Sequence, residues 1–347
     1  KDNGGSPMRQ VWIPKAGPPE VLQVRDAPEP QPGPGEVRIA VEAIGVNFAD
    51  IVGRLGMYAD APRPPFVPGF EVAGCVDAVG EGVDASHLGQ DVIGLTRFGG
   101  YSEQVCVPAG HALPRPATMT VEQGAAFLVS ALTAYAGLVA LGGIKRGERV
   151  LIQAAAGGVG LMAVDIARLH EATIFGTASA SKHDFLRERG VQHPIDYRQR
   201  DFVREIERLT GDAGVHIALD SIGGRSWMRS YRTLAPGGRL VICGVTTLTP
   251  GLRRSLWGLV KFALGVPWLA LNPVRLANDT RGVLGVNLGR LWDQDALLRG
   301  WAEQMIAYHA AGHVHVHVDR VFPLADAAAA HRYIQERRSV GKVVLRP

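Results

Sequence analysis

Cysteine is scarce in this sequence, with 3 residues among 347. Cys75, Cys106 and Cys243 are far apart and odd in number, which argues against a disulfide framework and against a multi-cysteine metal site. Free thiols are typical of reducing compartments, so we expect a cytoplasmic protein.

An excess of charge of one sign is also lacking. The chain has 37 Lys and Arg against 33 Asp and Glu, a formal net charge of +4. Because the basic residues form no run with interleaved aromatics, we expect no nucleic-acid partner. Glycine and proline together stay below the roughly 25–30% that marks low-complexity chains, and about 150 residues per domain predicts two domains.

Long hydrophobic runs are few. Residues Gln123 to Ile144 carry no charge and are long enough to span a bilayer, but small residues fill much of the run, which favours a buried helix. A second run, Leu256 to Leu271, is interrupted by Lys261 and Pro267 and could only lie on a membrane surface. No secretion signal is recognised, and Lys1 to Pro7 are interpreted as a linker remnant.

The texture of the sequence changes along the chain. Residues 8–110 contain short strand-like runs between Gly and Pro clusters, which is typical of an irregular, mostly antiparallel β domain. From Val150 onward, strand and helix patterns alternate, which predicts a parallel sheet with crossover helices. Strands are expected at Val150–Gln153, Thr173–Gly176, His216–Asp220, Arg239–Val245, Val314–Val318 and Lys342–Leu345, and helices at Val159–His170, Lys182–Arg189 and Gln294–Ala311.

A glycine-rich turn after the strand at Val150 is the strongest local signal. The pattern Ala155-x-Gly157-x-x-Gly160 joins that strand to a helix, as in dinucleotide-binding βαβ units. Gly157 would let the backbone approach a pyrophosphate, and Gly160 would let the helix pack against the strand. The turn therefore predicts a cofactor site at Ala156, Gly157, Gly158, Val159 and Gly160; the alternative is a tight turn that serves packing alone.

The next strand suggests which dinucleotide binds. NAD enzymes place Asp or Glu about 20 residues after the turn to bind the ribose, but the segment Ile174 to Lys182 offers no carboxylate. Ser179 and Lys182 could instead bind a 2′-phosphate, which favours NADP(H). The alternative for Lys182 is a solvated start of a helix.

Several motifs occur in the order found in one enzyme family. They are Pro34-Gly-Glu-Val-Arg-Ile, Gly45-Val-Asn-Phe-Ala-Asp, Pro68-Gly-Phe-Glu-Val-Ala-Gly, Gly99-Gly-Tyr-Ser-Glu, the glycine-rich turn, Leu219-Asp-Ser-Ile-Gly-Gly and Gly341-Lys-Val-Val-Leu. Over residues 8–347 the chain resembles the medium-chain dehydrogenase/reductase superfamily, in its zinc-independent, zeta-crystallin-like quinone oxidoreductase branch. Asp165 departs from that branch's signature, which usually has Gln there.

The resemblance implies an α/β fold with a doubly wound Rossmann sheet and a GroES-like, mostly antiparallel β domain. Residues 8–129 and 292–347 would form the GroES-like domain, and 130–291 the Rossmann domain. The positions at which zinc-dependent relatives hold the catalytic metal correspond to Asn47, Phe70 and near Val129. Because none of these side chains is a thiolate or an imidazole, we expect no metal.

Candidate catalytic residues also come from the resemblance. Tyr58 stands where related enoyl-thioester reductases present a proton donor, although it could pack over the cleft while water supplies the proton. Asn47 could hold a substrate carbonyl or the nicotinamide ribose, or could serve only its turn. We expect Asp50 to stabilise its own loop.

Further cofactor contacts are implied at five positions. Thr133 resembles the residue beside the nicotinamide, with a helix Thr bonded to its own backbone as the alternative. Tyr197 matches a position near the adenosine phosphate, with surface packing as the alternative. Gly244 and Asn287 fall at strand ends near the nicotinamide half, and Lys342 stands in the closing motif.

Three further features remain open. His313, His315 and His317 would share one strand face, where an exposed histidine face is favoured over a metal site. The segment Thr249 to Thr280 resembles the insertion of the vesicle amine transport protein branch, and could be a pocket lid, a subunit contact or, through residues 252–271, a lipid-facing surface. The run Val283-Leu-Gly-Val-Asn-Leu resembles an edge through which such enzymes form homodimers.

The sequence thus predicts a zinc-independent, NADPH-dependent oxidoreductase. It would transfer hydride to a small-molecule quinone or α,β-unsaturated carbonyl compound. The alternative is an NADPH-binding sensing or membrane-associated protein of the same fold with little turnover.

Overall fold

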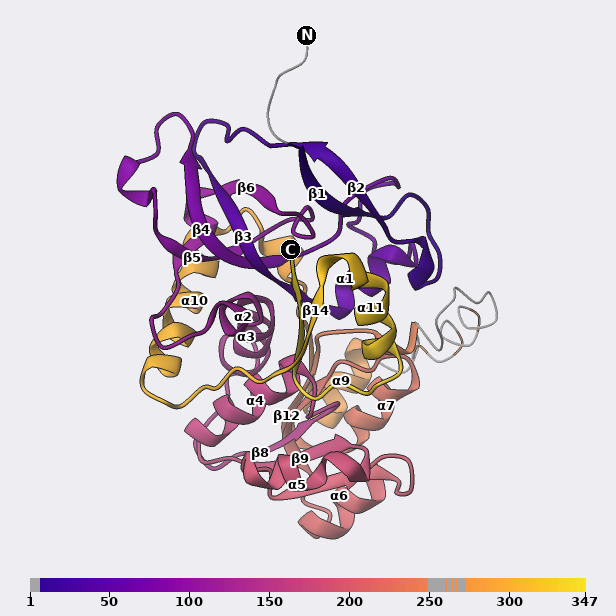
Figure 1. Ribbon diagram of the computed structural model, residues 1–347. Helices are drawn as coiled ribbons and strands as arrows, with labels where there is room; N and C mark the ends of the chain where they lie inside the picture. The colour runs from indigo at the N-terminus through magenta and orange to yellow at the C-terminus, as the bar shows by residue number, and fades with distance from the viewer. Residues whose placement is uncertain (1–6, 249–259, 261–263, 265, 267–271) are drawn as a thin grey trace.

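A computed structural model of the chain describes residues 7–248, 260, 264, 266 and 272–347. Two large sheets lie one above the other in Figure 1, with early segments in the upper part and the middle of the chain in the lower part. The last segments, drawn in yellow, run back from the lower part to the upper one. An antiparallel ribbon of β1 (Pro7–Trp12) and β2 (Gln23–Pro28) lies beside the upper sheet.

The upper sheet has seven strands, in the order β14-β15-β3-β4-β5-β7, with β6 also paired to β3. All its pairings are antiparallel except that of β14 with β15. The strands are β3 (Glu36–Val46), β4 (Glu71–Val79), β5 (Asp91–Leu95), β6 (Gln104–Pro108), β7 (Ala112–Pro114), β14 (Val318–Pro323) and β15 (Lys342–Arg346). This sheet confirms the predicted mostly antiparallel β part, and it includes β14 and β15 from the end of the chain.

The lower sheet has six parallel strands in the order β10-β9-β8-β11-β12-β13. The first of these strands in the chain, β8, lies inside the sheet, and later strands are added on both of its sides. This is the doubly wound Rossmann arrangement. The strands are β8 (Arg149–Ile152), β9 (Thr173–Ala178), β10 (His193–Asp196), β11 (Val215–Asp220), β12 (Leu234–Ile242) and β13 (Gly282–Gly285). Strands covered by helices on both faces need continuous apolar runs, and Val150, Leu151 and Ile152 are fully buried.

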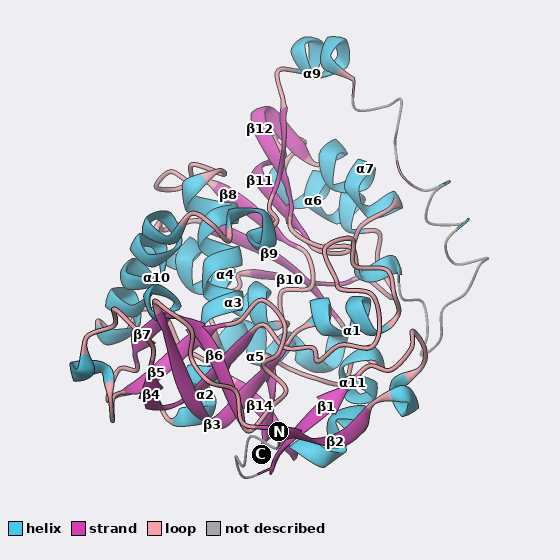
Figure 2. Cartoon of the chain, turned by 90° about the horizontal axis from the view of Figure 1, so that it is seen from above, coloured by secondary structure: helices cyan, strands magenta, loops and turns pink. Residues whose placement is uncertain are grey.

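Helices connect and cover these strands (Figure 2). The α-helices are α1 (Phe48–Arg54), α2 (Val121–Ala125), α3 (Leu128–Tyr135), α4 (Gly158–Leu169), α5 (His183–Glu188), α6 (Phe202–Thr210), α7 (Arg225–Arg232), α9 (Pro273–Asp279), α10 (Asp295–Ala310) and α11 (Ala327–Gln335). A π-helical turn, η4 (Ala136–Ala140), continues α3. Short 3₁₀ turns are η1 (Pro19–Val21), η2 (Ala85–His87), η3 (Ala109–His111), η5 (Ala180–Lys182), η6 (Thr246–Leu248), η7 (Leu288–Leu291) and η8 (Leu324–Asp326).

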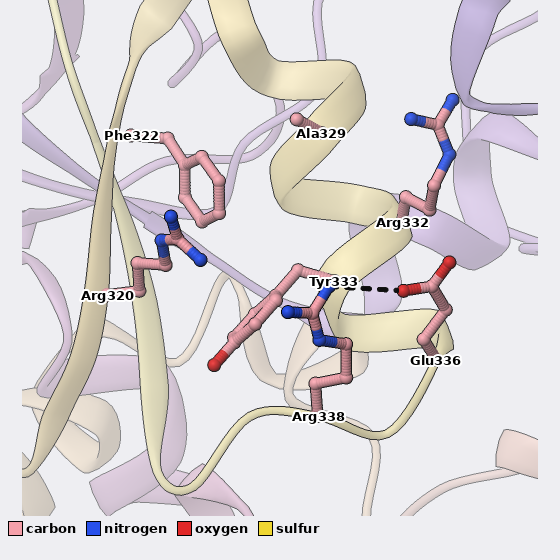
Figure 3. Close-up of a pocket in the computed structure, with 7 residues that line it drawn as sticks. All are labelled: Arg320, Phe322, Ala329, Arg332, Tyr333, Glu336 and Arg338. Carbon is pink, nitrogen blue, oxygen red and sulfur yellow. Dashed lines mark ion pairs between the residues drawn. The ribbon is translucent and has the colours of Figure 1, made fainter.

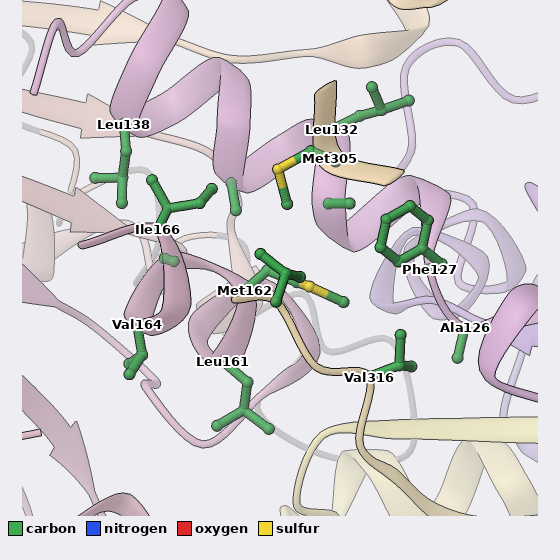
Figure 4. Close-up of a cluster of buried hydrophobic side chains, with 14 of the residues drawn as sticks. Ala126, Phe127, Leu132, Leu138, Leu161, Met162, Val164, Ile166, Met305 and Val316 are labelled. Carbon is green, nitrogen blue, oxygen red and sulfur yellow. The ribbon is translucent and has the colours of Figure 1, made fainter. Parts of the chain in front are cut away.

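The largest apolar core joins the two sheets through helices. Side chains of three helices converge in Figure 4: Phe127 at the start of α3, Leu132 on α3, Met162 on α4 and Met305 on α10. Val316 reaches the same cluster from the returning chain. Burying a large aliphatic side chain contributes roughly 1.5–3 kcal/mol. This shared core therefore fixes the position of one sheet relative to the other.

The uncharged run from residue 123 to 144 forms α2, α3 and η4 inside this core, as the buried-helix interpretation predicts. Among the described residues, no helix has the length and apolar content needed to cross a bilayer. Most of the segment 249–280 lies outside the described residues. Within 252–271, the structure describes residues 260, 264 and 266 alone.

Two strand predictions are wrong in detail. The strand expected at Arg239–Val245 spans Leu234–Ile242, because the pairing with β13 ends at Ile242. Residues 314–317 form no strand, although Val314 and Val316 are buried while His315 is exposed. The alternation is real, but the His315 amide donates to the Asp165 carboxylate at 2.9 Å instead of to a neighbouring strand.

Candidate active site

One large cavity, of about 1190 Å³, lies between the two sheets and takes its lining from both. Every residue that the sequence proposed for catalysis or cofactor binding lines it, although these come from distant parts of the chain. They are Asn47, Tyr58, Thr133, Ala156, Gly157, Gly158, Val159, Gly160, Ser179, Lys182, Tyr197, Gly244, Asn287 and Lys342. The cavity is therefore the candidate active site.

The glycine-rich turn is as tight as its sequence suggests. A Cβ on Gly160 would lie 2.5 Å from the Ala154 carbonyl oxygen, and one on Gly158 would lie 2.7 Å from Lys342 Cδ. Gly157 stands at the N-cap of the twelve-residue helix α4 without a side-chain cap. The open amides and the positive end of the helix dipole suit a phosphate group, so the turn fits a dinucleotide.

A cationic group lies at the end of β9, near Ser179. Lys182 Nζ donates to the backbone oxygens of Arg337 at 3.0 Å and Ser339 at 2.6 Å, which leaves one ammonium hydrogen for a ligand. The Arg337 guanidinium donates to Tyr197 Oη at 3.4 Å. Burial lowers the pKa of Lys182. This group of Lys182, Tyr197 and Arg337 would fit a 2′-phosphate.

Arg337 was missed by the reasoning from sequence. It follows α11, 155 residues after Lys182 and outside every motif. A bridge between Gly157 and Gly341 brings the returning chain against the glycine-rich turn. Tertiary contacts, and not a sequence motif, bring Arg337 to the cavity.

The floor of the cavity holds a buried ion pair. Lys342 Nζ donates to Glu71 Oε1 at 2.7 Å, to Asn47 Oδ1 at 2.7 Å and to the Val46 carbonyl at 3.0 Å. Glu71 also accepts from the Val129 amide at 2.9 Å. All three ammonium hydrogens of Lys342 are thus used within the protein, and only its stem is open to a cofactor.

The amide of Asn47 belongs to the same network. Its Nδ2 donates to Glu71 Oε1 at 2.9 Å and approaches the Gly45 carbonyl at 3.4 Å, while its Oδ1 accepts from Lys342. What remains is a lone pair on Oδ1. This arrangement suits a donor such as a ribose hydroxyl better than a substrate carbonyl.

None of the three positions aligned with zinc ligands is a thiolate or an imidazole. Asn47 is bonded to Lys342 and Glu71, Phe70 has an aromatic ring, and the Val129 amide donates to Glu71. Within the described part of the chain, no three His, Cys, Asp or Glu side chains are grouped as a metal site would require. His313 and His315 are exposed, and His317 packs on Phe185 at 4.8 Å between ring centroids.

A second buried chain of hydrogen bonds runs behind the floor. Arg54 donates to His331 Nδ1 at 3.2 Å, and an arginine can only donate, so His331 Nε2 carries the proton and donates to Tyr101 Oη at 3.0 Å. Tyr101 then donates to Asp50 Oδ2 at 3.2 Å. Asp50 also accepts from the Asn47 and Gly69 amides, so it holds its own loop, as expected.

Aromatic side chains, among them Tyr58 and Phe70, form one wall of the cavity. Tyr58 meets Phe70 and Phe98 edge-on, with ring centroids 5.8 and 6.3 Å apart. Burial raises the pKa of Tyr58, so its hydroxyl keeps its proton at neutral pH. On the same loop as Tyr58, Asp60 accepts a hydrogen bond from Asn287 Nδ2 at 3.3 Å and forms an ion pair with Arg290 at 2.9 Å.

Two other proposed cofactor residues are engaged locally. Thr133 Oγ1 donates to the Val129 carbonyl at 2.7 Å, which matches the alternative of a helix Thr bonded to its own backbone. A Cβ on Gly244 would lie 3.1 Å from the Ser221 carbonyl oxygen, so the strand ends approach closely there.

A smaller hollow of about 140 Å³ lies between β14 and α11 (Figure 3). Arg320 stacks on Phe322 and Tyr333, with 5.0 and 5.6 Å to the centroids, and Arg338 stacks on Tyr333 at 4.8 Å. Glu336 pairs with Arg338 at 3.6 Å. Because these cations already have partners, this hollow is not a second candidate site.

Comparison with known proteins agrees with this architecture. Residues 33–117 match the alcohol dehydrogenase GroES-like domain, and residues 189–345 match the family described as zinc-binding dehydrogenase. The synaptic vesicle membrane protein VAT-1 homolog of Homo sapiens is 41% identical over 330 residues, 94% of this chain and 82% of that protein. The 2-haloacrylate reductase of a Burkholderia species is 33% identical over 96% of this chain and 98% of that enzyme.

A solved structure is also similar over nearly the whole chain. The quinone oxidoreductase of Escherichia coli, in complex with NADPH, superposes with a TM-score of 0.87 at 30% identity, covering 98% of this chain and 100% of that one. The predicted GroES-like and Rossmann fold classes are confirmed. The chain belongs to the medium-chain dehydrogenase/reductase superfamily, in its zinc-independent quinone oxidoreductase and VAT-1-like branch.

Proposed function

We propose that this protein is an NADPH-dependent oxidoreductase that reduces a quinone or the activated C=C bond of an unsaturated carbonyl compound. The observation that carries the proposal is that one large cavity joins a dinucleotide turn to an aromatic wall with a protonated tyrosine. The relatives named as a quinone oxidoreductase and a 2-haloacrylate reductase support the same reaction class.

The residues present fit the cofactor. The α4 amides would hold the pyrophosphate, and Lys182 with Arg337 and Tyr197 would hold the 2′-phosphate. The Asn47 lone pair would accept a ribose hydroxyl. When bound, NADPH supplies the hydride, and the protein contributes orientation and exclusion of water.

Reduction of an activated C=C bond also needs a proton at the α carbon. Tyr58 projects into the cavity and keeps its proton at neutral pH, so it is the proposed donor. Asn47 contributes indirectly, by positioning the ribose. We also propose that residues 8–129 and 292–347 form one domain and 130–291 the other, because the strands of each sheet come from those ranges.

Steady-state loss of nicotinamide absorbance tests the proposal, with NADPH and NADH against a panel of quinones and enones. We expect turnover that prefers NADPH, and a Lys182→Ala variant that loses at least about tenfold of this preference, since charge-assisted bonds to a phosphate contribute about 1.5–3 kcal/mol. The exposed Lys145 is the control, and Lys145→Ala should keep the preference. Tight NADPH binding without turnover on any acceptor would contradict the proposal.

A second candidate function is a membrane-associated NADPH-binding protein with little turnover. The relative named as a synaptic vesicle membrane protein favours it. Its sequence basis, the aromatic and basic segment with Trp257 and Trp268, lies outside the described residues. Co-sedimentation with anionic lipid vesicles that is lost when both tryptophans are replaced would favour this candidate. Absence of co-sedimentation would contradict it.

A further inference from the structure

The charged side chains that line the cavity are all basic. Among the described residues that line it, no Asp or Glu is present, and the charged ones are Arg97, Lys182, Arg225, Arg229, Arg337 and Lys342. Lys342 is neutralised by Glu71 and Arg229 by Asp201, at 2.7 and 2.8 Å. Lys182 and Arg337 belong to the 2′-phosphate group, which leaves Arg97 and Arg225 as cations without a role in the proposed cofactor site. Of these two, Arg97 is the one whose charge acts on Tyr58.

Arg97 stands at the aromatic end of the cavity. It follows β5 and lies between Thr96 and Phe98, and its side chain is exposed. Its positive charge acts on Tyr58, where it opposes the effect of burial on the pKa. Within the described part of the chain, the guanidinium of Arg97 makes no hydrogen bond or ion pair. Asp60, the acid whose charge acts most strongly on Tyr58, is already paired with Arg290.

The backbone around Arg97 is held in an unusual conformation. Phe98 has a φ of +71°, which is costly for a residue with a side chain, and Gly99 follows at +83°. Hydrogen bonds fix both ends of this turn: the Thr96 amide donates to the Phe70 carbonyl and the Gly99 amide to the Val67 carbonyl, each at 2.9 Å. Phe98 packs on Phe70 with ring centroids 5.0 Å apart.

These two hydrogen bonds and the Phe98 contact hold the turn that carries Arg97 in place. The effect of this turn is to present an open guanidinium beside apolar rings, at a cavity with no Asp or Glu among its described lining residues. A planar guanidinium matches the two oxygens of a carboxylate, and partial exclusion of water strengthens that pair. A neutral substrate would leave this cation unused.

We infer that the acceptor reduced by this protein carries a carboxylate or a similar anionic group, which Arg97 binds at the mouth of the cleft while the apolar body lies against Tyr58 and Phe70. This inference rests on the proposed reductase function. It narrows the substrate class to anionic enones or quinones.

The test compares two enones of equal shape that differ in charge, (E)-4-(4-carboxyphenyl)but-3-en-2-one and its para-carboxamide. With NADPH at low ionic strength, we expect kcat/KM to favour the carboxylate by about 10-fold to 100-fold, in line with a charge-assisted hydrogen bond. Arg97→Met should abolish this preference and leave the carboxamide within about threefold, a range that corresponds to less than about 0.7 kcal/mol. Arg97→Lys should keep part of it.

The control is Arg146→Met, which removes an exposed arginine paired with Glu171 near the amino ends of β8 and β9, outside the cavity lining, and should keep the preference. Equal kcat/KM for the two enones in the unmodified protein, or an equal loss for both in Arg97→Met, would overturn the inference.

A binding experiment separates this inference from the proposed function. Calorimetry with the NADP⁺ complex measures the affinity for the saturated ketones, 4-(4-carboxyphenyl)butan-2-one and its carboxamide. Tighter binding of the carboxylate that is lost in Arg97→Met supports the anion site even if neither enone is reduced, in which case only the proposed function fails. Equal affinities for the two ketones overturn the anion site whatever the turnover.

Discussion

At the residue scale, the buried polar groups of the cavity floor are arranged so that each donor has an acceptor. The Lys342 ammonium donates its three hydrogens to Val46, Asn47 and Glu71, and Glu71 also accepts a hydrogen bond from the Val129 amide. Buried charges are costly unless they are paired and hydrogen-bonded. The pair therefore supplies a fixed, satisfied floor at the positions that the resemblance aligns with zinc ligands.

Asp50 is fully buried, and burial raises its pKa from 3.8 to about 7. A carboxyl with a raised pKa in the folded state contributes stability at low pH that is lost as pH rises from about 4 to about 7. At 1.36 kcal/mol per unit, the loss is roughly 4 kcal/mol. The free energy of unfolding of Asp50→Asn should therefore fall less between pH 4 and pH 7 than that of the unmodified protein. Denaturant unfolding at several pH values measures this difference.

The exposed Asp293 provides the matched control, and Asp293→Asn should leave the pH dependence unchanged. A difference in unfolding free energy between Asp50→Asn and the unmodified protein that stays constant from pH 4 to pH 8 would refute the assignment.

Tyr58 is the second residue with a direct test. If its hydroxyl delivers the proton to the α carbon, Tyr58→Phe should lower kcat by about 100-fold, the lower range for a positioned general acid. NADPH affinity should stay the same, because the ring remains against Phe70 and Phe98. Stopped-flow single turnovers with an enone measure the step, and Tyr135→Phe on α3 is the control. An unchanged rate would mean that water is the donor.

Some of these residues could be found from the sequence and others could not. Lys182 was found because a cation and a missing acid follow one strand. Arg337 and Arg97 belong to no motif, since their relevance depends on which distant segments meet at the cavity. The sequence also did not show that Asn47 and Lys342 bind each other, because 295 residues separate them.

At the element scale, the β8–α4 unit was predictable because strand, turn and helix lie within 21 consecutive residues. The segment 314–317 was not, because alternating burial indicates an extended chain but does not say what accepts its hydrogen bonds. Here the acceptor is the Asp165 side chain, which packs from α4. The extent of β12 was missed for a similar reason, since its partner β13 sets where pairing ends.

The close packing of α4 on the turn gives a prediction at this scale. Gly160→Ala would place a Cβ 2.5 Å from one backbone oxygen and 2.6 Å from the next, so the helix must shift. We expect a lower melting temperature and at least about a tenfold weaker NADPH affinity, because the amides that face the phosphate move with the helix. Calorimetry and thermal unfolding measure both.

Gly300 in α10 is the control, because a Cβ there meets nothing within 4 Å. Gly300→Ala should leave NADPH affinity unchanged and should stabilise the helix by about 0.5–1 kcal/mol. Equal NADPH affinity in Gly160→Ala and the unmodified protein would contradict the role of this turn.

At the scale of the whole molecule, the two sheets and the core between them place the cavity. The classes of both sheets followed from the change of texture along the sequence, and their contact did not, because it depends on side chains of α3, α4 and α10 that pack together. The lower sheet also ends in β13, whose outer edge pairs with no other strand among the described residues.

Unpaired strand edges are sites for association with another chain. We therefore predict a homodimer formed through the β13 edges of two copies. Sedimentation velocity at micromolar concentration should give twice the chain mass of 37.1 kDa. A single species of monomer mass would refute the dimer.

The most direct measurement for the central claim follows the transferred hydrogen. NADPH deuterated at the transferable C4 position is mixed with the protein and the para-carboxy enone, and the product is examined by NMR and mass spectrometry. The account predicts one deuterium at the β carbon and a solvent-derived hydrogen at the α carbon. A reduced product without deuterium, or no product with any enone or quinone although NADPH binds, would contradict it.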